Sequence, residues 1–497
     1  MPSLIRSLAL VPALLSSIAQ AVNPVEIRGL DFVDTVTNKR LMIVGVDYQP
    51  GGQAGYKPTS KQDALTDADV CLRDAVVMQK LGVNTIRVYN VDPTLDHSEC
   101  MSIFNAAGIY LILDVNSPFS GESINRAEPW TSYHEDYLTR IFGVVENFKN
   151  FPNTLAFFAA NEVMNDLTTA EYNPMYIRAV QRDLKNYIKN HVDRTIPVGY
   201  SAADVREILH DTWAYMQCSH DDDQSSSDFF GLNSYSWCGN GDMQSSGYTD
   251  MVNMFKNSSI PVFYSEYGCN KVQPRIFTEV EALYGEQMTV LSGGLVYEYS
   301  QEEADYGLVV INENGTLSLR EDFENLQGQF NKLDLSLIQS TNSSGNLQPP
   351  ECSMDLITAE EFSTNFTIPA VCPGCADIIK NGISNPMNGK LVDVTNTKPK
   401  QAVYGTNGAE IEGLELTKLT EVNVPGGSNF SSGTASGTAT GTAAQPSATK
   451  TGSASSVVST PSTPSPTSTP TAKGKASSLD ETKFLWFALV TFWVVGR

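Results

Sequence analysis

Residues 154–163 read TLAFFAANEV, an apolar run that ends in Asn161 and Glu162. The run follows Pro152 and Asn153, a pair that breaks regular structure, and a helix-like segment comes after it. A continuous apolar run of this length is typical of a buried parallel strand. The sequence therefore predicts a buried strand whose carboxyl end presents the Glu162 carboxylate.

A second apolar run ends in the same way. Residues 260–270 read IPVFYSEYGCN and place Glu266 near the end of a strand. For Glu162 alone, a structural salt bridge inside the fold is an equal alternative, because a buried carboxylate needs a partner or a purpose. Two strand-end carboxylates that face one cleft favour glycoside chemistry: one donates a proton to the leaving oxygen, and the other attacks the sugar or activates water.

Strand and helix signals alternate over the first three hundred residues. The expected strands are 41–48, 85–89, 110–115, 154–163, 197–200, 229–236, 261–267 and 294–299, and the expected helices include 67–81, 97–107, 137–148 and 175–188. This alternation predicts the α/β class, and eight strands predict closure into a (β/α)8 barrel, the TIM barrel. Both glutamates, on the fourth and seventh strands, would then lie at the carboxyl-terminal lip, where catalytic loops converge. A doubly wound open sheet is the alternative, but no glycine-rich phosphate loop follows the first strand.

The two ends of the chain carry processing signals. Residues 1–21 combine a basic start, an apolar run and a small-x-small pattern, which predicts a secretory signal peptide rather than a longer membrane anchor. A short apolar tail at 484–495 follows a polar spacer and small residues. This pattern predicts a glycosylphosphatidylinositol (GPI) signal with Gly474 or Ala476 as the attachment residue. A membrane helix is the alternative, and it would need about 20 apolar residues.

The composition is that of an extracellular chain. Eight cysteines, an even number, are typical of a secreted protein stapled by disulfides. A formal charge of -23 and a pI near 4.6 argue against nucleic acid or an anionic membrane surface as the partner. Sequons that could carry N-glycans, if exposed, begin at Asn257, Asn314, Asn342, Asn365 and Asn429.

Neither a metal nor a cofactor is expected. The run from His220 to Asp223 could be taken for a metal site, but a solvated loop is the favoured interpretation because no spaced partner ligands accompany it.

Several motifs follow one another in a fixed order along residues 22–337. They are VDYQP at 46–50, IRVY at 86–89, NE at 161–162, GLNSYSWC at 231–238, SEYGC at 265–269 and GGLVYE at 293–298. Together they resemble the fungal β-1,3-glucanosyltransferases of glycoside hydrolase family 72. The resemblance implies a GPI-anchored enzyme of the plasma membrane and cell wall, and a monomer. Such an enzyme cuts an internal β-1,3-glucan bond and joins the new reducing end to the non-reducing end of another glucan chain.

The resemblance also implies roles for single residues. Glu162 would be the acid/base and Glu266 the nucleophile of a retaining reaction, which requires carboxyl groups about 5 to 5.5 Å apart. Asn161 would bond the sugar 2-hydroxyl, with a structural amide as the alternative. The other expected substrate contacts are Tyr89, Asp114, Ser117, Asn125, Asp204, Arg206, Asn233, Tyr235 and Tyr297. Arg206 stands closer to Asp204 than the family pattern expects.

The family pattern further implies the disulfides Cys71–Cys100, Cys238–Cys269 and Cys218–Cys352 and leaves Cys372 and Cys375, which could bond each other. Spacing alone does not select among the many connectivities of eight cysteines. A zinc site at Cys372 and Cys375 is a weak alternative, because no second ligand pair follows and the chain has only five histidines.

The expected organisation is a catalytic barrel at 22–340, a small extension at 341–425, a stalk at 426–478 and a removed tail at 479–497. The extension has too few cysteines for the cysteine-rich carbohydrate module that many family members add. Its mixed or alternating stretches at 356–366 and 410–424 predict a small strand-containing unit that packs on the barrel. The stalk is almost entirely Ser, Thr, Gly, Ala and Pro, which predicts a disordered, O-glycosylated spacer.

Two other functions are compatible with the same residues. A β-glucan hydrolase would use both glutamates, and a non-catalytic wall-binding protein would keep the cleft without the chemistry. Transfer requires that a sugar hydroxyl outcompete water at about 55 M. Aromatic acceptor subsites and displacement of the leaving chain are our hypothesis for how this happens.

Overall fold

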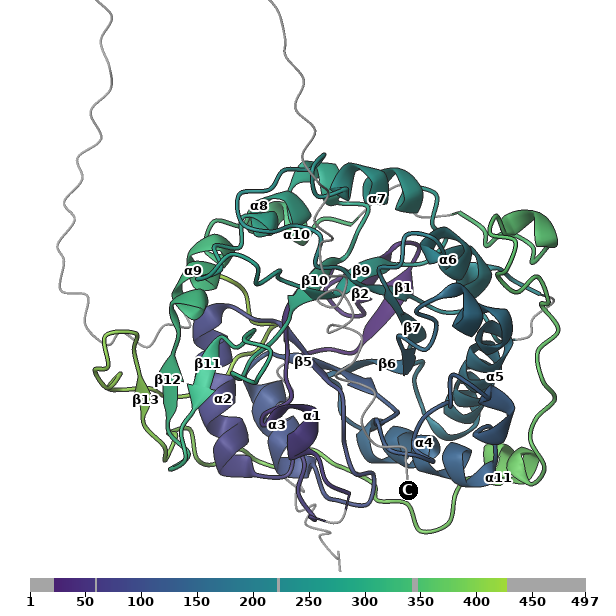
Figure 1. Ribbon diagram of the computed structural model, residues 1–497. Helices are drawn as coiled ribbons and strands as arrows, with labels where there is room; N and C mark the ends of the chain where they lie inside the picture. Colours follow the sequence, from purple (N-terminus) through teal and green to yellow (C-terminus); the bar gives the residue numbers. More distant parts are fainter. Residues whose placement is uncertain (1–21, 59, 221–223, 342–346, 427–497) are drawn as a thin grey trace, which may run out of the picture. The chain divides into compact units, whose positions relative to one another are not determined.

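Eight parallel strands close into a barrel in the computed structural model, which describes residues 22–58, 60–220, 224–341 and 347–426. The strand order is β10-β3-β4-β5-β6-β7-β8-β9, and Figure 1 looks into this barrel. The strands are β3 (Ile43–Asp47), β4 (Thr85–Val88), β5 (Tyr110–Asp114), β6 (Thr154–Asn161), β7 (Val198–Ala203), β8 (Phe230–Asn233), β9 (Val262–Tyr267) and β10 (Gly293–Val296). All eight expected strands are confirmed, and the open-sheet alternative is wrong.

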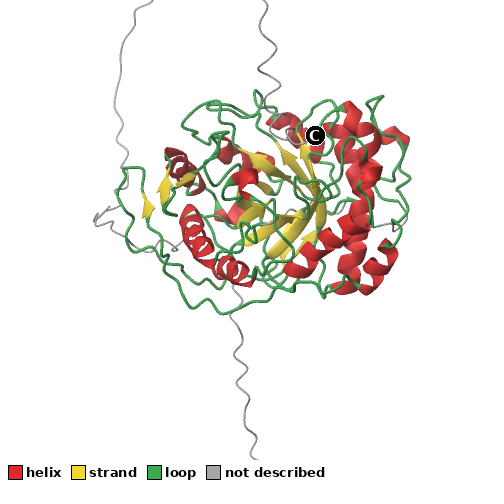
Figure 2. Ribbon diagram, turned by 60° about the horizontal axis from the view of Figure 1, so that its bottom comes forward, coloured by secondary structure: helices red, strands yellow, loops and turns green. Residues whose placement is uncertain are grey.

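Helices surround the strands, as Figure 2 shows in red around yellow. They are α2 (Ala68–Leu81), α3 (Ser98–Ala106), α4 (Glu135–Phe148), α5 (Leu167–His191), α6 (Leu209–Gln217), α7 (Tyr248–Phe255), α8 (Glu279–Leu283) and α9 (Glu321–Phe330), with the short α1 (Gly52–Gly55) and α10 (Leu335–Ile338). The first three expected helices are confirmed as α2, α3 and α4.

Helix α5 begins at Leu167, earlier than the expected start at Met175. Asp166 and Thr169 form a capping box that satisfies the first turn. Pro174 inside the helix has no N–H to donate to the Ala170 carbonyl one turn back. The backbone N–H of Ser363 donates to that carbonyl instead, at 3.1 Å. A distant segment therefore supplies the bond that the proline lacks.

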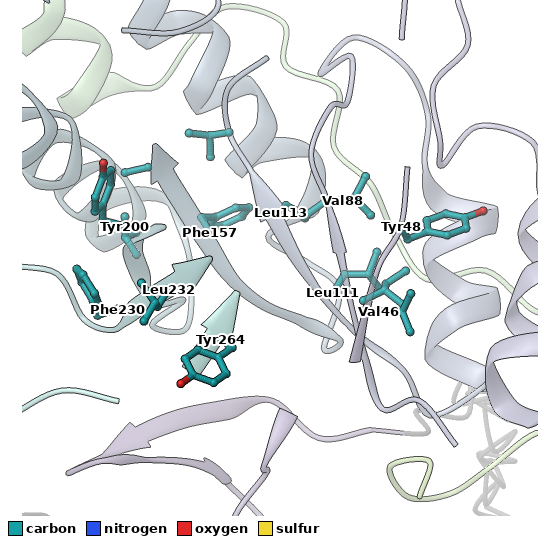
Figure 3. Close-up of a cluster of buried hydrophobic side chains, with 14 of the residues drawn as sticks. Val46, Tyr48, Val88, Leu111, Leu113, Phe157, Tyr200, Phe230, Leu232 and Tyr264 are labelled. Atoms are coloured by element: carbon teal, nitrogen blue, oxygen red, sulfur yellow. The ribbon is translucent and has the colours of Figure 1, made fainter. Parts of the chain in front are cut away.

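The apolar side chains form two layers because successive residues of a strand point to opposite faces. Side chains on the outer face of the strands pack against the helices, and Figure 3 labels ten members of this buried cluster, among them Phe157 and Leu232. A second buried cluster includes Phe158, Phe229, Phe263 and Leu295. Phe157 and Phe158 thus belong to different layers, as expected for neighbours on one strand.

A hairpin that the sequence reasoning missed joins the second cluster. Strands β1 (Val25–Arg28) and β2 (Asp31–Asp34) pair antiparallel before the barrel begins. The ring of Phe32 in β2 lies 5.9 Å from Phe229 and 6.0 Å from Phe263. The hairpin therefore covers apolar side chains of the barrel strands and excludes water from them.

Residues beyond the barrel run along its helices. Strand β13 (Val403–Tyr404) joins β11 (Val309–Ile311) and β12 (Leu317–Leu319) in a small sheet, and α11 (Cys375–Asn381) is the one α-helix among the described residues after α10. Polar bonds attach this segment: Asp211 of α6 accepts the N–H groups of Thr358 and Ala359, and Asn423 donates to the Val83 carbonyl. Residues 356–366, an expected alternating stretch, form no strand.

Several expected features lie outside the described residues. They are the signal peptide, the GPI tail, all of the stalk after residue 426, Asp221 to Asp223, Asn342 and Asn429. Among the helices that are described, none has the length and apolar character needed to cross a bilayer.

Gly231 of β8 tests how tightly the barrel interior is packed. A Cβ at Gly231 would lie 2.6 Å from Ser265 Oγ and 2.9 Å from the Phe158 ring. We expect Gly231→Ala to lower the free energy of unfolding by about 2 kcal/mol through overpacking, measured by urea denaturation. Gly328→Ala in α9 is the control: among the described residues, no atom beyond its own neighbours and helix backbone lies within 4 Å of the added Cβ. Helix propensity should make that variant about 0.5–1 kcal/mol more stable. Equal stability of the two variants would contradict the packing argument.

Candidate active site

Glu162 and Glu266 lie at the same lip of the barrel. Glu162 follows the last residue of β6, and Glu266 is near the end of β9. The backbone of Glu162 has φ 48°, the left-handed region that non-glycine residues seldom adopt. Two bonds hold this conformation: the Glu162 N–H donates to the Ser201 carbonyl at 2.8 Å, and Arg126 Nη2 donates to the Glu162 carbonyl at 2.8 Å. Strained backbone of this kind is concentrated at functional sites.

Each carboxylate oxygen of Glu266 receives a tyrosine hydroxyl. Tyr89 donates to Oε1 at 2.8 Å, and Tyr235 donates to Oε2 at 2.6 Å. Burial raises the pKa of both tyrosines well above the usual value, so both hydroxyls keep their protons as donors. Arg87 Nη1 lies 3.4 Å from Oε1. Three donors therefore fix the orientation of one buried carboxyl group.

The pKa of Glu266 is raised to about 7, and burial is the main cause. The negative charge of Glu162 raises this pKa further. The positive charge of Arg87 and the hydroxyls of Tyr235 and Tyr89 act in the opposite direction, because each stabilises the ionised form. The site therefore contains two interacting carboxyl groups. Of the two, Glu266 has the hydrogen-bond donors that stabilise a negatively charged carboxylate.

Arg87 of β4 connects the parts of this site, and the sequence reasoning assigned it no role. Its Nε and Nη2 donate to the two oxygens of Asp114, each at 2.9 Å. Nη2 also donates to Asn161 Oδ1 at 3.0 Å. The guanidinium carbon lies 4.3 Å from the centroid of the Tyr89 ring and 4.5 Å from that of Phe158. The motif around residues 86–89 contained Arg87, but only the barrel brings its partners to it.

The side-chain amides of Asn161 and Asn233 have orientations that their partners define. Asn233 Oδ1 accepts from Ser265 Oγ at 2.7 Å and lies 3.1 Å from Ser201 Oγ. Asn233 Nδ2 therefore points the other way and donates to Glu162 Oε1 at 2.8 Å and to Asn161 Oδ1 at 3.1 Å. Asn161 Oδ1 already accepts from two donors. The amide N–H groups of Asn161 are therefore directed toward other acceptors.

Asp47 ends β3 beside this network and was also assigned no role from the sequence. Its side chain is fully buried, and neither oxygen has a hydrogen-bond partner among the described residues. Burial, and then the charge of Glu266, raise the pKa of Asp47 well above its usual range. An ionised carboxylate without a donor is strongly unfavourable in such a place. Burial therefore favours the neutral form of Asp47, while the charge of Arg87 and the nearby Tyr89 hydroxyl favour its ionised form.

Four tyrosines contact one another at the site: Tyr89 follows β4, Tyr235 follows β8, and Tyr297 and Tyr306 follow β10. Tyr297 follows β10, and its ring centroid lies 6.5 Å from Tyr89, 6.2 Å from Tyr235 and 5.3 Å from Tyr306, with each pair edge to face. Tyr306 was not predicted because it lies in a loop without apolar periodicity. Burial raises the pKa of Tyr306 to about 12. These rings form an aromatic wall with hydroxyl groups at its edge.

The side chains of the remaining expected contacts form their recorded bonds with groups other than the two glutamates. The side chain of Asp114 is bonded by Arg87, and Ser117 Oγ donates to Glu122 Oε2 at 2.6 Å. Asn125 is exposed, and its Nδ2 donates to Thr131 Oγ1 at 3.3 Å. These bonds stabilise the loop that carries Ser117 and Asn125.

Asp204 and Arg206 pair with each other, with Arg206 Nε 2.5 Å from Asp204 Oδ1. Asp204 Oδ2 also accepts from Ser234 Oγ at 2.6 Å, just after β8. This pair therefore borders the site, and no bond that the structure records joins it to either glutamate.

All eight cysteines are paired, in the combinations Cys71–Cys100, Cys218–Cys352, Cys238–Cys269 and Cys372–Cys375. The third disulfide joins the loops that follow β8 and β9, on either side of the nucleophile candidate. Among the sequons that the structure describes, Asn257, Asn314 and Asn365 are exposed.

Three comparisons with known proteins identify the same family. Residues 14–334 match the family model described as glucanosyltransferase, in glycoside hydrolase family 72. The chain is 53% identical over 436 residues to 1,3-beta-glucanosyltransferase gel2 of Aspergillus fumigatus, covering 87% of this chain and 91% of that protein. It is 45% identical over 410 residues to the probable 1,3-beta-glucanosyltransferase GAS3 of Saccharomyces cerevisiae, covering 78% and 77%.

A solved structure extends the comparison to the fold. Saccharomyces cerevisiae Gas2p in complex with laminaritriose and laminaritetraose has a TM-score of 0.63 and 37% sequence identity, over 71% of this chain and 77% of that chain. The family model, the identities and the barrel with its paired strand-end glutamates agree. The chain belongs to the glucanosyltransferase family, glycoside hydrolase family 72.

Proposed function

We propose that this chain is a retaining β-1,3-glucanosyltransferase that cleaves an internal bond of one β-1,3-glucan and transfers the new reducing end to the non-reducing end of another. The observation that carries the proposal is the hydrogen-bond network in which Asn233, Asn161 and Arg87 link Glu162 to Glu266. The names of the relatives, and the laminari-oligosaccharides bound to Gas2p, support β-1,3-glucan as donor and acceptor.

In the first step the Glu266 carboxylate attacks the anomeric carbon while the carboxylic acid of Glu162 protonates the departing glycosidic oxygen. The carbon–oxygen bond breaks, the distal chain leaves with a new hydroxyl group, and an ester joins the sugar to Glu266. Asn161 is suited to donate its amide N–H to the sugar 2-hydroxyl, because its Oδ1 is occupied by Arg87 and Asn233. Such a bond strengthens as the ring approaches the oxocarbenium-like transition state.

In the second step Glu162, now ionised, takes the proton of an acceptor hydroxyl, whose oxygen attacks the anomeric carbon. The ester bond breaks and Glu266 leaves as the carboxylate, so no water is consumed. Asn233 Nδ2, at 2.8 Å from Glu162 Oε1, stabilises that group in its ionised state. The partly buried rings of Tyr235 and Tyr297, which pack against the buried Tyr306, are suited to stack on the sugar of an acceptor and to keep water out.

The proposal includes a place of action. Export through the signal at 1–21 and a lipid anchor at Gly474 or Ala476 would hold a monomer at the outer face of the plasma membrane and in the cell wall. Four disulfides and three exposed sequons support an extracellular protein that carries N-glycans at Asn257, Asn314 and Asn365.

The activity is tested by incubating the protein with one laminari-oligosaccharide of defined length and separating the products. Transfer must yield products longer than the substrate, together with the shorter fragment. Shorter products alone would identify a β-glucan hydrolase. No products, together with retained binding of the oligosaccharide, would identify a wall-binding protein.

The two glutamate roles can be separated with an aryl laminari-oligosaccharide whose leaving group needs no proton. We expect Glu162→Gln to lower transfer from natural glucan by about 10²- to 10⁴-fold, yet still to form the ester with the aryl donor. Mass spectrometry should find the added sugar on Glu266. Glu266→Gln should form no ester with either donor. An ester in the Glu266→Gln variant would refute the assignment of the nucleophile.

The pH profile tests the contacts of Glu266. Its pKa of about 7 belongs to a group that must be ionised to attack, so kcat/KM should fall as the pH drops below that value. Tyr235→Phe removes a donor that lowers this pKa, so the acid limb should move to higher pH by about one unit. Tyr404→Phe, in β13, is the matched control and should leave the limb in place. An unchanged limb in Tyr235→Phe would mean that another group sets it.

A further inference from the structure

Exposed aromatic side chains are concentrated on one part of the molecule. Among the described residues, the tyrosine, tryptophan and phenylalanine side chains exposed by more than a third are Phe119 (41%), Trp130 (51%) and Tyr172 (45%). Phe119 and Trp130 lie between β5 and α4, and Tyr172 lies in α5, which follows β6. Segments that follow barrel strands lie at the carboxyl-terminal lip, the lip that holds Glu162 and Glu266.

Trp130 and Tyr172 contact each other edge to face. Trp130 is in the short helix η1 (Pro129–Thr131), and its ring centroid lies 5.9 Å from that of Tyr172 at an interplanar angle of 88°. About half of each side chain is open to solvent, so the pair covers only part of its own apolar surface. Contiguous exposed apolar surface on a soluble protein often marks a binding site.

A second aromatic pair supports the exposed one. Tyr133 and Tyr176 lie three and four residues further along the same two segments, with centroids 6.0 Å apart. Tyr133 is buried, and its hydroxyl donates to Asp183 Oδ2 of α5. Since Asp183 is itself fully buried, the base of the exposed pair is fixed to the helix. A rigid support is what an aromatic stacking surface requires.

Hydrogen bonds connect this exposed pair to the acid/base candidate. Arg126 Nη2 donates to the Glu162 carbonyl at 2.8 Å, and Asn173 Nδ2, next to Tyr172 in α5, donates to the Arg126 carbonyl at 2.8 Å. The backbone N–H of Asn125 donates to Ser132 Oγ at 2.8 Å, which closes the loop that carries Trp130. These hydrogen bonds thus link the segments that carry the exposed rings to the lip around Glu162.

We propose that Trp130 and Tyr172 form a distal subsite for a β-1,3-glucan chain, beyond the sugars held between Glu162 and Glu266. The inference rests on the proposed function and adds the place at which a long glucan chain is bound. A β-glucose ring offers C–H groups on its faces and hydroxyl groups at its edge, which suits the face of an aromatic ring. The net charge of -23 disfavours an anionic polymer but leaves a neutral glucan unaffected.

The test measures binding in the Glu162→Gln background, so that the ligand is not consumed. Isothermal titration calorimetry with laminari-oligosaccharides of increasing length gives the ratio of long-chain to short-chain affinity. We expect Trp130→Ala and Tyr172→Ala each to lower that ratio about 3- to 10-fold, and Trp130→Phe to keep most of it. Met354→Ala is the control, because Met354 is 68% exposed and lies in the extension.

The outcomes separate this inference from the proposed function. An unchanged ratio, or an equal loss of affinity at every length, would overturn the subsite, since the rings would then do nothing or only support the loop. If the wild-type protein makes longer products while the ratio is unchanged, only the subsite is wrong. If it neither binds nor extends any laminari-oligosaccharide, the proposed function fails and the subsite with it.

Transfer assays identify which chain occupies the subsite. In one arm the donor is lengthened against a fixed short acceptor, and in the other the acceptor is lengthened against a fixed donor. A length-dependent loss in Trp130→Ala in the first arm assigns the subsite to the donor, and a loss in the second assigns it to the acceptor. A loss in neither arm contradicts the subsite.

Discussion

The buried guanidinium of Arg87 is the interaction on which the site depends. A charge without solvent is stable only when anions and acceptors surround it, and here Asp114 takes two of its N–H groups while Asn161 and Glu266 face the others. The planar group thereby fixes residues from four strands relative to one another. It also holds down the pKa of Glu266, which burial alone would raise further.

The other contacts of the site limit the number of unpaired charges in a buried volume. Asp114 is paired with Arg87, burial raises the pKa of Asp47, and Glu266 accepts the Tyr89 and Tyr235 hydroxyls that an attacking carboxylate needs. Glu162, in a strained left-handed conformation, is held by Asn233, whose own amide is oriented by two serines. Geometry and protonation are therefore set by the same hydrogen bonds.

Segments outside the eight strands contribute to the packing and hydrogen bonding of the barrel. The β1-β2 hairpin covers apolar rings of the barrel strands, and Ser363 supplies the hydrogen bond that Pro174 cannot make. The Cys218–Cys352 disulfide and the bonds to Asp211 fasten the segment beyond the barrel to α6 and the loop after it. The exposed aromatic rings of Trp130 and Tyr172 belong instead to η1, between β5 and α4, and to α5, which follows β6.

The sequence by itself determined the eight strands, their parallel order and the two glutamates at strand ends, because apolar periodicity and breaker residues act locally. The resemblance of its motifs to the glucanosyltransferase family also implied roles for Tyr89, Asn161, Asn233, Tyr235 and Tyr297. Only the tertiary structure decided that Arg87 and Asp47 belong to the site, that Asp114 is an arginine partner, and that Tyr306 joins the aromatic wall. Those facts depend on contacts between residues far apart in the chain and on burial, which no local pattern records.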